Sequence, residues 1–268
     1  MPEAAVVADG VELVHGDHRA LRDATFEIPM GVAVAVIGPN GSGKSSLLDA
    51  IAGLLVVRSG TMSVLGRAPG GWRGRVAYVL QSTEIPAQVP LTVREVVTMG
   101  RYARAGLVGR LGPTSRSAVD AAMDRVDVGD LSRRQVLELS GGQRQRVLVA
   151  QGLATDADIL LLDEPMTGLD VVSRQRITEV IDVERRAGRT VVFSTHDLAE
   201  AAEADLVVLL AGRVVAVGPP GEVLVTEHLL EAYRGRVVPV GGFGILDDPH
   251  HHGDRADRHD GHDHGANH

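Results

Sequence analysis

The chain has 268 residues, of which 44% are apolar, and its formal net charge at pH 7 is −8. This length and apolar content are enough for one sizeable core or two modest ones. The absence of cysteine excludes disulfides, thiolate metal sites and cysteine nucleophiles, and the negative charge argues against a nucleic-acid partner, which would require clustered arginine and lysine.

The N-terminal segment predicts a protein that is not exported. Its first residues, MPEAAVVADG, lack the basic region and apolar core of a signal peptide. No apolar run in the chain approaches the roughly 20 residues of a membrane span, and runs such as ILLL at 159–162 and LVVLLA at 206–211 have the length of strands. We therefore expect a soluble protein.

Short β-branched runs separated by turn residues fill residues 10–38 and predict three strands. The segment KSSLLDAIAGLL (44–55) has apolar residues at helical spacing and predicts a helix that ends before the glycine and arginine preceding TMSVLG. TMSVLG (61–66) predicts a further strand, and RVAYVLQ predicts a buried strand that ends at Gln81.

A helical pattern occupies most of the stretch from about Leu91 to Leu139, interrupted by glycine and proline. Strands and helices alternate again after it, over residues 158–163, 171–188, 190–197 and 204–218. An alternating pattern with a helical block inside it predicts an α/β core with an inserted helical subdomain. We expect the insertion at about residues 84–140 of a single domain spanning 1–240, since no internal repeat is present.

The segment GPNGSGKSS (38–46) matches the phosphate-binding pattern G-x-x-x-x-G-K-S between a β-branched strand and a helix. Its glycines let backbone N–H groups converge on an anion, and the helix N-terminus adds positive potential. Lys44 would reach the β- and γ-phosphates, and Ser45 would bind Mg²⁺. Lys44 is the only lysine beside 26 arginines, and we infer that a compact ammonium fits where the arginine fork does not. The predicted ATP contacts are Gly38, Pro39, Asn40, Gly41, Ser42, Gly43, Lys44, Ser45 and Ser46.

The segment ILLLDE (159–164) predicts a buried strand that carries Asp163 at an exposed C-terminal end. Ligands of α/β sheets bind at that end of the strands. Asp163 would hold Mg²⁺, directly or through water, and Glu164 would polarise an attacking water as general base.

Ser140, Gly141 and Gly142 form a small-residue turn at the start of an amphipathic helix. A serine hydroxyl and free backbone N–H groups at a helix start make a second anion site. One nucleotide does not need two such sites from one chain. We therefore expect two chains facing head-to-tail, each covering the γ-phosphate bound by the other.

Together these segments resemble the nucleotide-binding subunit of an ABC transporter, over about residues 5–235. Gln81 matches the loop that senses Mg²⁺ and the membrane partner, and Asp170, which ends TGLD, matches the loop that communicates across the dimer. His196 in FSTHD matches the switch histidine that contacts the γ-phosphate. The family signature LSGGQ corresponds to Leu139, Ser140, Gly141, Gly142 and Gln143.

The resemblance implies an α/β fold: a P-loop NTPase, RecA-like ABC ATPase core with an N-terminal antiparallel β subdomain and an inserted α-helical subdomain. It implies ATP hydrolysis with Mg²⁺. The implied catalytic residues are Glu164, His196, Gln81 and Lys44, and the implied Mg²⁺ ligands are Ser45, Gln81 and Asp163. The implied partners are integral-membrane permease subunits, a second copy of the chain and, indirectly, an extracytoplasmic metal-binding protein. The implied location is the cytoplasmic face of the cell membrane, as a peripheral subunit.

One departure from the family pattern stands out. Relatives usually present an aromatic residue, often tyrosine, that stacks on adenine, and by register that position is His15. An imidazole stacks with less area than a phenol ring. We expect a weaker adenine contact here, or one shared with neighbouring residues.

The transported substrate is indicated by the stretch between Gln81 and the signature, which faces the membrane subunits in this family. Residues 90–111 and 126–143 are similar to the subunits of zinc and manganese importers, and they overlap the broader group that takes up iron chelates and cobalamin. The resemblance therefore implies import of a metal cation, zinc or manganese, with the chelate group as the alternative.

The C-terminal tail, residues 241–268, supplies imidazoles and carboxylates suited to Zn²⁺, Ni²⁺ or Cu²⁺. We expect it to be disordered and to bind several ions weakly, and a purely solvated tail is the alternative. The candidate zinc ligands are His250, His251, His252, His259, His262, His264 and His268.

Two functions outside transport are alternatives, and the sequence disfavours both. Soluble ABC ATPases carry two ATPase domains or a long coiled-coil insertion, whereas this chain has one set of motifs and no sustained heptads. A scaffold that has lost catalysis would have lost catalytic residues, whereas Lys44, Asp163, Glu164 and His196 are all present.

Overall fold

The computed structural model describes residues 4–72, 74–81, 90–105, 112–233, 237–240 and 243–246, and it places the N-terminal strands in two sheets. The three predicted strands are confirmed as β1 (Ala4–His15), β2 (His18–Pro29) and β3 (Ala33–Ile37). β1 and β2 form an antiparallel hairpin, and β4 (Val57–Val64) pairs with the other edge of β1. The N-terminal antiparallel subdomain therefore has the strand order β2-β1-β4.

β3 belongs to a six-stranded sheet with the order β5-β6-β7-β3-β8-β9. The strands from β5 to β8 are parallel, and β9 runs antiparallel to β8 at the edge. β3, β6 and β7 are buried at every position, as expected for a parallel sheet covered on both faces. The other strands are β5 (Val76–Val79), β6 (Ile159–Leu162), β7 (Thr190–Thr195), β8 (Leu206–Leu210) and β9 (Val214–Gly218).

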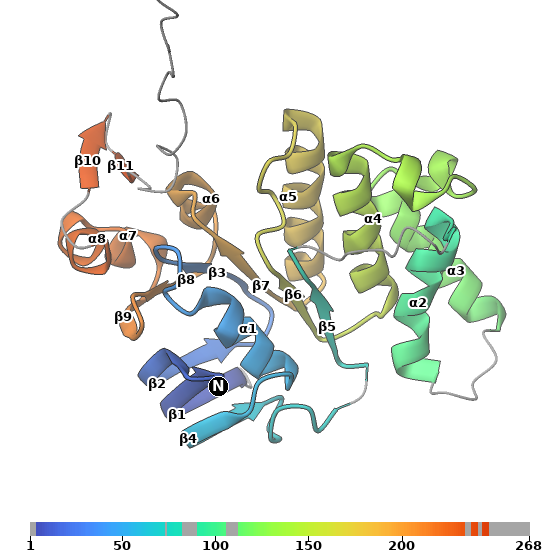
Figure 1. The fold of residues 1–268 in the computed structure, drawn as a ribbon. Coiled ribbons are helices and arrows are strands. Elements are labelled where there is room, and N and C mark those ends of the chain that lie inside the picture. The colour runs from blue at the N-terminus through green and yellow to red at the C-terminus, as the bar shows by residue number, and fades with distance from the viewer. Residues whose placement is uncertain are drawn as a thin grey trace, which may run out of the picture.

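Helices cover both faces of this sheet. Figure 1 shows α2, α3 and α4 grouped at one end of the molecule, beyond β5, as predicted for the helical block. The longer helices are α1 (Lys44–Ala52), α2 (Val93–Ala105), α3 (Pro113–Arg125), α4 (Gly141–Ala154) and α5 (Val171–Arg186). The shorter ones are α6 (Leu198–Ala202), α7 (Pro220–Val223), α8 (Thr226–Ala232) and 3₁₀ turns at Gly129–Leu131 and Val136–Glu138.

The hydrophobic interior consists of two cores, one on each face of the six-stranded sheet. Val34 and Val36 of β3 point into a core shared with α1 and the antiparallel sheet. Ala35 and Ile37 point into the core formed with the remaining helices. The alternation follows from the two-residue period of a strand, which sends successive side chains to opposite faces.

α4 joins the helical block to the central sheet. It starts directly after the predicted end of the insertion and packs against α2 and α3 as well as β5 and β6. Gly152 lies so close to β5 that an added Cβ would come within 2.7 Å of the Val79 side chain. The boundaries 84–140 stay a prediction, because α4 contacts both units.

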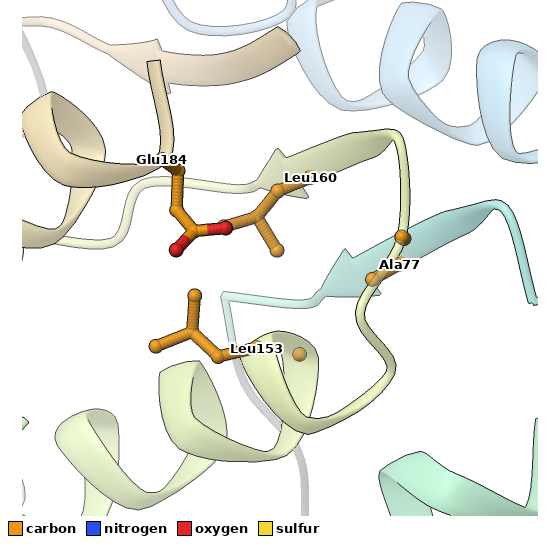
Figure 2. Close-up of a pocket in the computed structure, with 6 residues that line it drawn as sticks. Ala77, Leu153, Leu160 and Glu184 are labelled. Atoms are coloured by element: carbon orange, nitrogen blue, oxygen red, sulfur yellow. The ribbon is translucent and has the colours of Figure 1, made fainter. Parts of the chain in front are cut away.

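A buried ion-pair cluster connects α3 with α5. Glu184 of α5 is 2% exposed, and its carboxylate accepts hydrogen bonds from Arg125 of α3 and from Arg189. Figure 2 shows Glu184 facing Leu153 and Leu160 across a small gap, which has no room for a water molecule. The ion pairs stabilise the packing of the helical block against α5, and the gap beside them is not a ligand site.

The C-terminal segment begins as regular structure. β10 (Val237–Val240) and β11 (Phe243–Leu246) form an antiparallel hairpin, so part of the predicted disordered tail is a strand. The candidate zinc ligands of the tail lie outside the described residues. Among the helices that the structure describes, none combines the length and apolar character required to cross a bilayer.

Candidate active site

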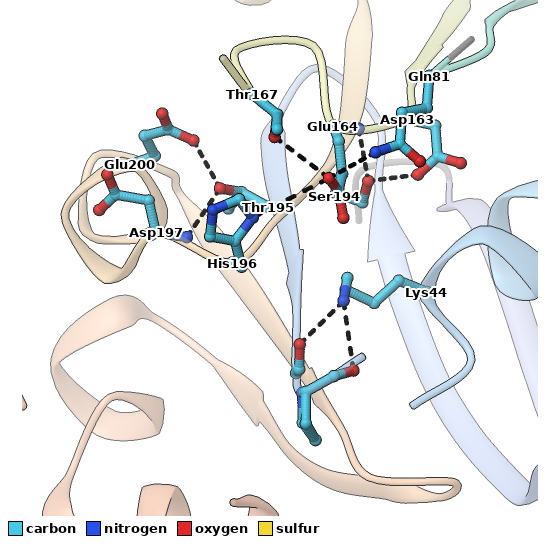
Figure 3. A network of polar contacts seen from close by, with 12 residues as sticks. Lys44, Gln81, Asp163, Glu164, Thr167, Ser194, Thr195, His196, Asp197 and Glu200 are labelled. Carbon is cyan, nitrogen blue, oxygen red and sulfur yellow. Dashed lines mark hydrogen bonds and ion pairs between the residues drawn. The ribbon is translucent and has the colours of Figure 1, made fainter. Parts of the chain in front are cut away.

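The parallel strands bring the predicted site residues to one edge of the sheet. β5, β6, β7 and β3 are neighbours, and the chain leaves each of them at the same edge. The phosphate loop, residues 38–46, follows β3 and leads into α1. Figure 3 shows residues at the C-terminal ends of the other three strands, which we call the hydrolysis cluster: Gln81, Asp163, Glu164, Ser194 and His196.

The phosphate loop has a backbone path that requires glycine. Gly38 has φ 150°, and a Cβ there would lie 2.1 Å from the carbonyl oxygen of Leu210. Gly43 has φ 102°, and its Cβ would lie 2.6 Å from the carbonyl oxygen of Ala20. No side chain fits at either position, so the close approach of β8 and β2 sets the shape of the loop.

Lys44 is the first residue of α1 and is 6% exposed. Its Nζ donates hydrogen bonds to the carbonyl oxygens of Gly38 at 2.9 Å and Pro39 at 3.3 Å. The hydroxyl of Ser42 is buried and has no hydrogen-bond partner among the described residues. A buried ammonium and an unpaired hydroxyl beside a helix N-terminus suit a phosphate group. The other predicted contacts lie in the same loop or in the first turn of α1: Asn40, Gly41, Ser45 and Ser46.

Asp163 is buried, with 5% exposure, and not exposed as the sequence suggested. It follows β6, which lies between β5 and β7, and neighbouring elements cover it. Its Oδ1 accepts a hydrogen bond from the Ser194 hydroxyl at 2.5 Å, and the same hydroxyl accepts one from the Glu164 N–H at 2.7 Å. Ser194 was not predicted, and its only signal is a polar residue inside the apolar run VVFST.

Glu164 has a left-handed backbone with φ 45°, which costs about 1–3 kcal/mol for a residue other than glycine. Its Oε2 accepts hydrogen bonds from Gln81 Nε2 at 2.8 Å and from the Thr167 hydroxyl at 3.2 Å. Strained backbone of this kind concentrates at functional sites, where the surrounding structure holds it. The Gln81 amide therefore orients the carboxylate predicted to act as general base.

The His196 side chain is 60% exposed, and its Nδ1 lies 4.0 Å from Glu164 Oε2. The two side chains are neighbours but are too far apart for a hydrogen bond. Thr195, which precedes His196, donates a hydrogen bond to Glu200 of α6. Neither Thr195 nor Glu200 was predicted from the sequence.

A second unpredicted group lies beside Asp163, one of the predicted Mg²⁺ ligands. Tyr78 of β5 has a buried hydroxyl beside Asp49 of α1 and Asp163, and burial together with these carboxylates raises the pKa of Tyr78. Burial also raises the pKa of Asp49, with Tyr78 and His15 acting in the opposite direction. His15 is exposed at the end of β1, opposite His18 across the hairpin turn.

The signature residues lie away from the phosphate loop of their own chain. Ser140 caps α4, because its hydroxyl accepts from the Gln143 N–H at 3.2 Å and the Gln143 side chain accepts from the Ser140 N–H at 3.1 Å. Gly142 contacts the start of α5, where an added Cβ would lie 2.7 Å from Asp170 Oδ2. Figure 1 shows α4 separated from α1 by β5 and β6. Leu139, which precedes the turn, is buried.

Asp170 caps α5 at this contact. Its carboxylate accepts the N–H of Ser173 at 2.8 Å and the Ser173 hydroxyl at 3.0 Å. These hydrogen bonds hold the pKa of Asp170 below its usual value. Within the part of the chain that the structure describes, no group of three or more histidine, aspartate or glutamate side chains is placed to hold a metal ion.

Comparison with known proteins gives one consistent answer. Residues 21–167 match the family model described as ABC transporter. The chain is 41% identical over 234 residues to the zinc transport system ATP-binding protein TroB of Treponema pallidum, covering 87% of this chain and 88% of that protein. It is 36% identical to the manganese transport system ATP-binding protein MntB of Bacillus subtilis, covering 87% and 93%. The structure of cbiO1 from Clostridium perfringens, part of the ABC transporter complex cbiONQ, matches with a TM-score of 0.71 at 25% identity, covering 85% and 94%.

Proposed function

This chain belongs to the ABC transporter family, and from that premise we propose that it is the ATP-hydrolysing subunit of an importer for a metal cation, zinc or manganese. The observation that carries the proposal is the assembly of the phosphate loop and the hydrolysis cluster at one sheet edge. The similarity to the zinc and manganese transport proteins along 87% of the chain supports the choice of cargo.

The phosphate loop binds the β- and γ-phosphates of ATP through its backbone N–H groups and Lys44. Glu164 accepts a proton from the attacking water as general base. Gln81 holds the Glu164 carboxylate by the hydrogen bond described above, so that the base is oriented before ATP arrives. His196, which follows β7, contacts the γ-phosphate through its exposed imidazole.

Mg²⁺ would be held by Ser45, Gln81 and Asp163, and it would neutralise charge on the phosphates. A hydroxyl, an amide oxygen and a carboxylate form the oxygen donor set that a hard cation prefers. Ser194 orients the Asp163 carboxylate. The nitrogen of the Gln81 amide donates to Glu164, which leaves its oxygen for the metal.

Two chains form a head-to-tail dimer in which each signature turn meets the nucleotide bound by the other chain. This arrangement explains why the Ser140 turn is separated from the phosphate loop of its own chain. The contact of Gly142 with Asp170 joins the signature to the start of α5. A shift of either motif on ATP binding is thereby passed to the other.

The chain acts at the cytoplasmic face of the cell membrane, as a peripheral subunit bound to permease subunits. An extracytoplasmic metal-binding protein delivers the cation to the permease and does not contact this chain. ATP binding closes the dimer, hydrolysis reopens it, and the movement is transmitted to the membrane helices.

Metal uptake tests the cargo. We expect deletion of the gene to lower cellular zinc or manganese, measured by ICP mass spectrometry, and the wild-type gene to restore it. A Glu164→Gln copy is the matched control and should not restore uptake. Loss of iron chelate or cobalamin uptake would instead identify one of these as the cargo. Normal uptake of zinc, manganese, iron chelate and cobalamin would favour an ABC ATPase that does not act in transport.

We further propose that the histidine-rich tail binds incoming zinc. The chemistry of seven imidazoles interspersed with aspartates supports weak binding of several ions. Titration of Zn²⁺ into the full chain should show more bound ions than titration into a chain of residues 1–246. A full chain with the tail histidines replaced by glutamine should match the truncated one. Equal zinc binding by all three proteins would contradict the proposal.

A further inference from the structure

Glu200 of α6 lies next to Thr195, the residue before His196 (Figure 3). Its side chain is 14% exposed, and its Oε2 accepts a hydrogen bond from the Thr195 hydroxyl at 2.5 Å. The same hydroxyl accepts a hydrogen bond from the Asp197 N–H at 3.0 Å. The residues on both sides of His196 are therefore tied to one hydroxyl, and that hydroxyl is held by Glu200.

Glu200 also faces the start of α5. Arg174 Nε lies 3.9 Å from Glu200 Oε1, and the Arg174 N–H donates to the carbonyl oxygen of Asp170 at 3.0 Å. Burial raises the pKa of Glu200, whereas the Thr195 hydroxyl, Arg174 and His196 act to lower it. The carboxylate thus links the His196 loop to the α5 turn that contacts the signature.

A carboxylate that is mostly removed from water destabilises a fold unless its partners compensate. α6 does not need Glu200 for its own start, because the Asp197 carboxylate caps it by accepting the Ala199 N–H at 2.8 Å. The His196 imidazole, in contrast, makes no hydrogen bond to the described residues and depends on the backbone for its position. The hydrogen bond that Glu200 accepts comes from Thr195, the residue that precedes His196 in the chain.

We propose that Glu200 is a positioning residue for His196, which it aligns through the Thr195 hydroxyl and connects to α5 through Arg174. The inference rests on the proposed role of His196 in ATP hydrolysis. Glu200 does not touch the nucleotide in this scheme. Its removal therefore lowers the rate of the chemical step and leaves ATP affinity unchanged.

The test compares steady-state ATP hydrolysis by full-length variants. Glu200→Ala should lower kcat about tenfold, the size expected for losing a hydrogen bond to a charged group, with KM for ATP within about twofold. Thr195→Val should lower kcat similarly, and Thr195→Ser, which keeps the hydroxyl, should restore it. Glu95→Ala is the matched control, since Glu95 also accepts a threonine hydroxyl, from Thr92 at 2.7 Å at the exposed start of α2, and it should leave kcat unchanged.

A double-mutant cycle separates positioning from general destabilisation. In a His196→Ala background, Glu200→Ala should cause no further loss in single-turnover hydrolysis, because its effect acts through the missing imidazole. A second tenfold loss in that background would overturn the inference, as would wild-type kcat in Glu200→Ala. Thermal melting shows whether Glu200→Ala is folded. If it is not, the comparison of Thr195→Val with Thr195→Ser tests the inference, and equal kcat values for these two variants would overturn it. Normal hydrolysis by His196→Ala would overturn the proposed role of His196 itself.

Discussion

The phosphate loop and the hydrolysis cluster lie at the same sheet edge but are built in different ways. The loop is one continuous segment, and Lys44 bonds to carbonyl oxygens five and six residues before it. The cluster is formed by side chains from three strand ends, and the hydrogen bond from Gln81 to Glu164 joins residues 83 positions apart. The loop is shaped by backbone and steric limits, and the cluster by long-range hydrogen bonds. Substitutions in the loop should therefore act through shape, and those in the cluster through charge and hydrogen bonding.

The largest expected effect comes from Lys44→Arg. The charge is conserved, but the Lys44 ammonium is buried against two carbonyl oxygens, and a guanidinium fork is bulkier than an ammonium. We expect ATP hydrolysis to fall at least about 100-fold. Arg186→Lys, at an exposed position on α5, is the reciprocal control and should hydrolyse ATP normally. Substantial turnover by Lys44→Arg would show that shape does not govern the loop.

Glu164→Gln tests the cluster, because it keeps the shape and removes the charge. We expect kcat to fall about 100-fold or more through loss of the general base, with an ATP-bound dimer that accumulates on size-exclusion chromatography. Glu179→Gln on the exposed face of α5 is the control. Hydrolysis at the wild-type rate by Glu164→Gln would refute the general-base role.

The signature turn is an intermediate case, with a local cap and a long-range neighbour. An added Cβ at Gly142 would lie 2.5 Å from the Ser173 hydroxyl, whereas one at Gly141 meets nothing within 4 Å. We expect Gly142→Ala to lower the free energy of unfolding of the single chain by about 1–2 kcal/mol, as a damaged helix cap does. Gly141→Ala should not lower it. Urea denaturation of both variants measures the difference, and equal stability would contradict the Gly142 contact with α5.

The smallest expected effect comes from His15→Tyr, at the adenine end of the site. A phenol ring offers more stacking area than imidazole, and a gain of about 0.5–1 kcal/mol corresponds to two- to fivefold tighter ATP binding. Equilibrium binding of a fluorescent ATP analogue measures the change. His18→Tyr, across the hairpin turn, is the control and should leave affinity unchanged. Unchanged or weaker binding by His15→Tyr would count against the assignment of this position.

The sequence alone was sufficient for the features that lie in continuous segments. The phosphate loop, the Asp163–Glu164 pair, the LSGGQ turn and the three N-terminal strands were all predicted from spacing and residue type. A phosphate nest is made of consecutive backbone N–H groups, so it can be recognised as a continuous sequence motif. The family and its fold followed from the same segments and are confirmed.

Only the tertiary structure decided how these segments support one another. The burial of Asp163, the hydrogen bond from Ser194 to it and the contact of Gly142 with Asp170 each depend on which strands and helices become neighbours. Ser194 is 31 residues from Asp163, and no spacing rule connects a serine in one strand with the aspartate after another. Sheet order brings them together, because parallel pairing of β6 with β7 aligns their ends. The sequence thus determined which chemical groups are present, and the packing of strands determined which of them hold the others in place.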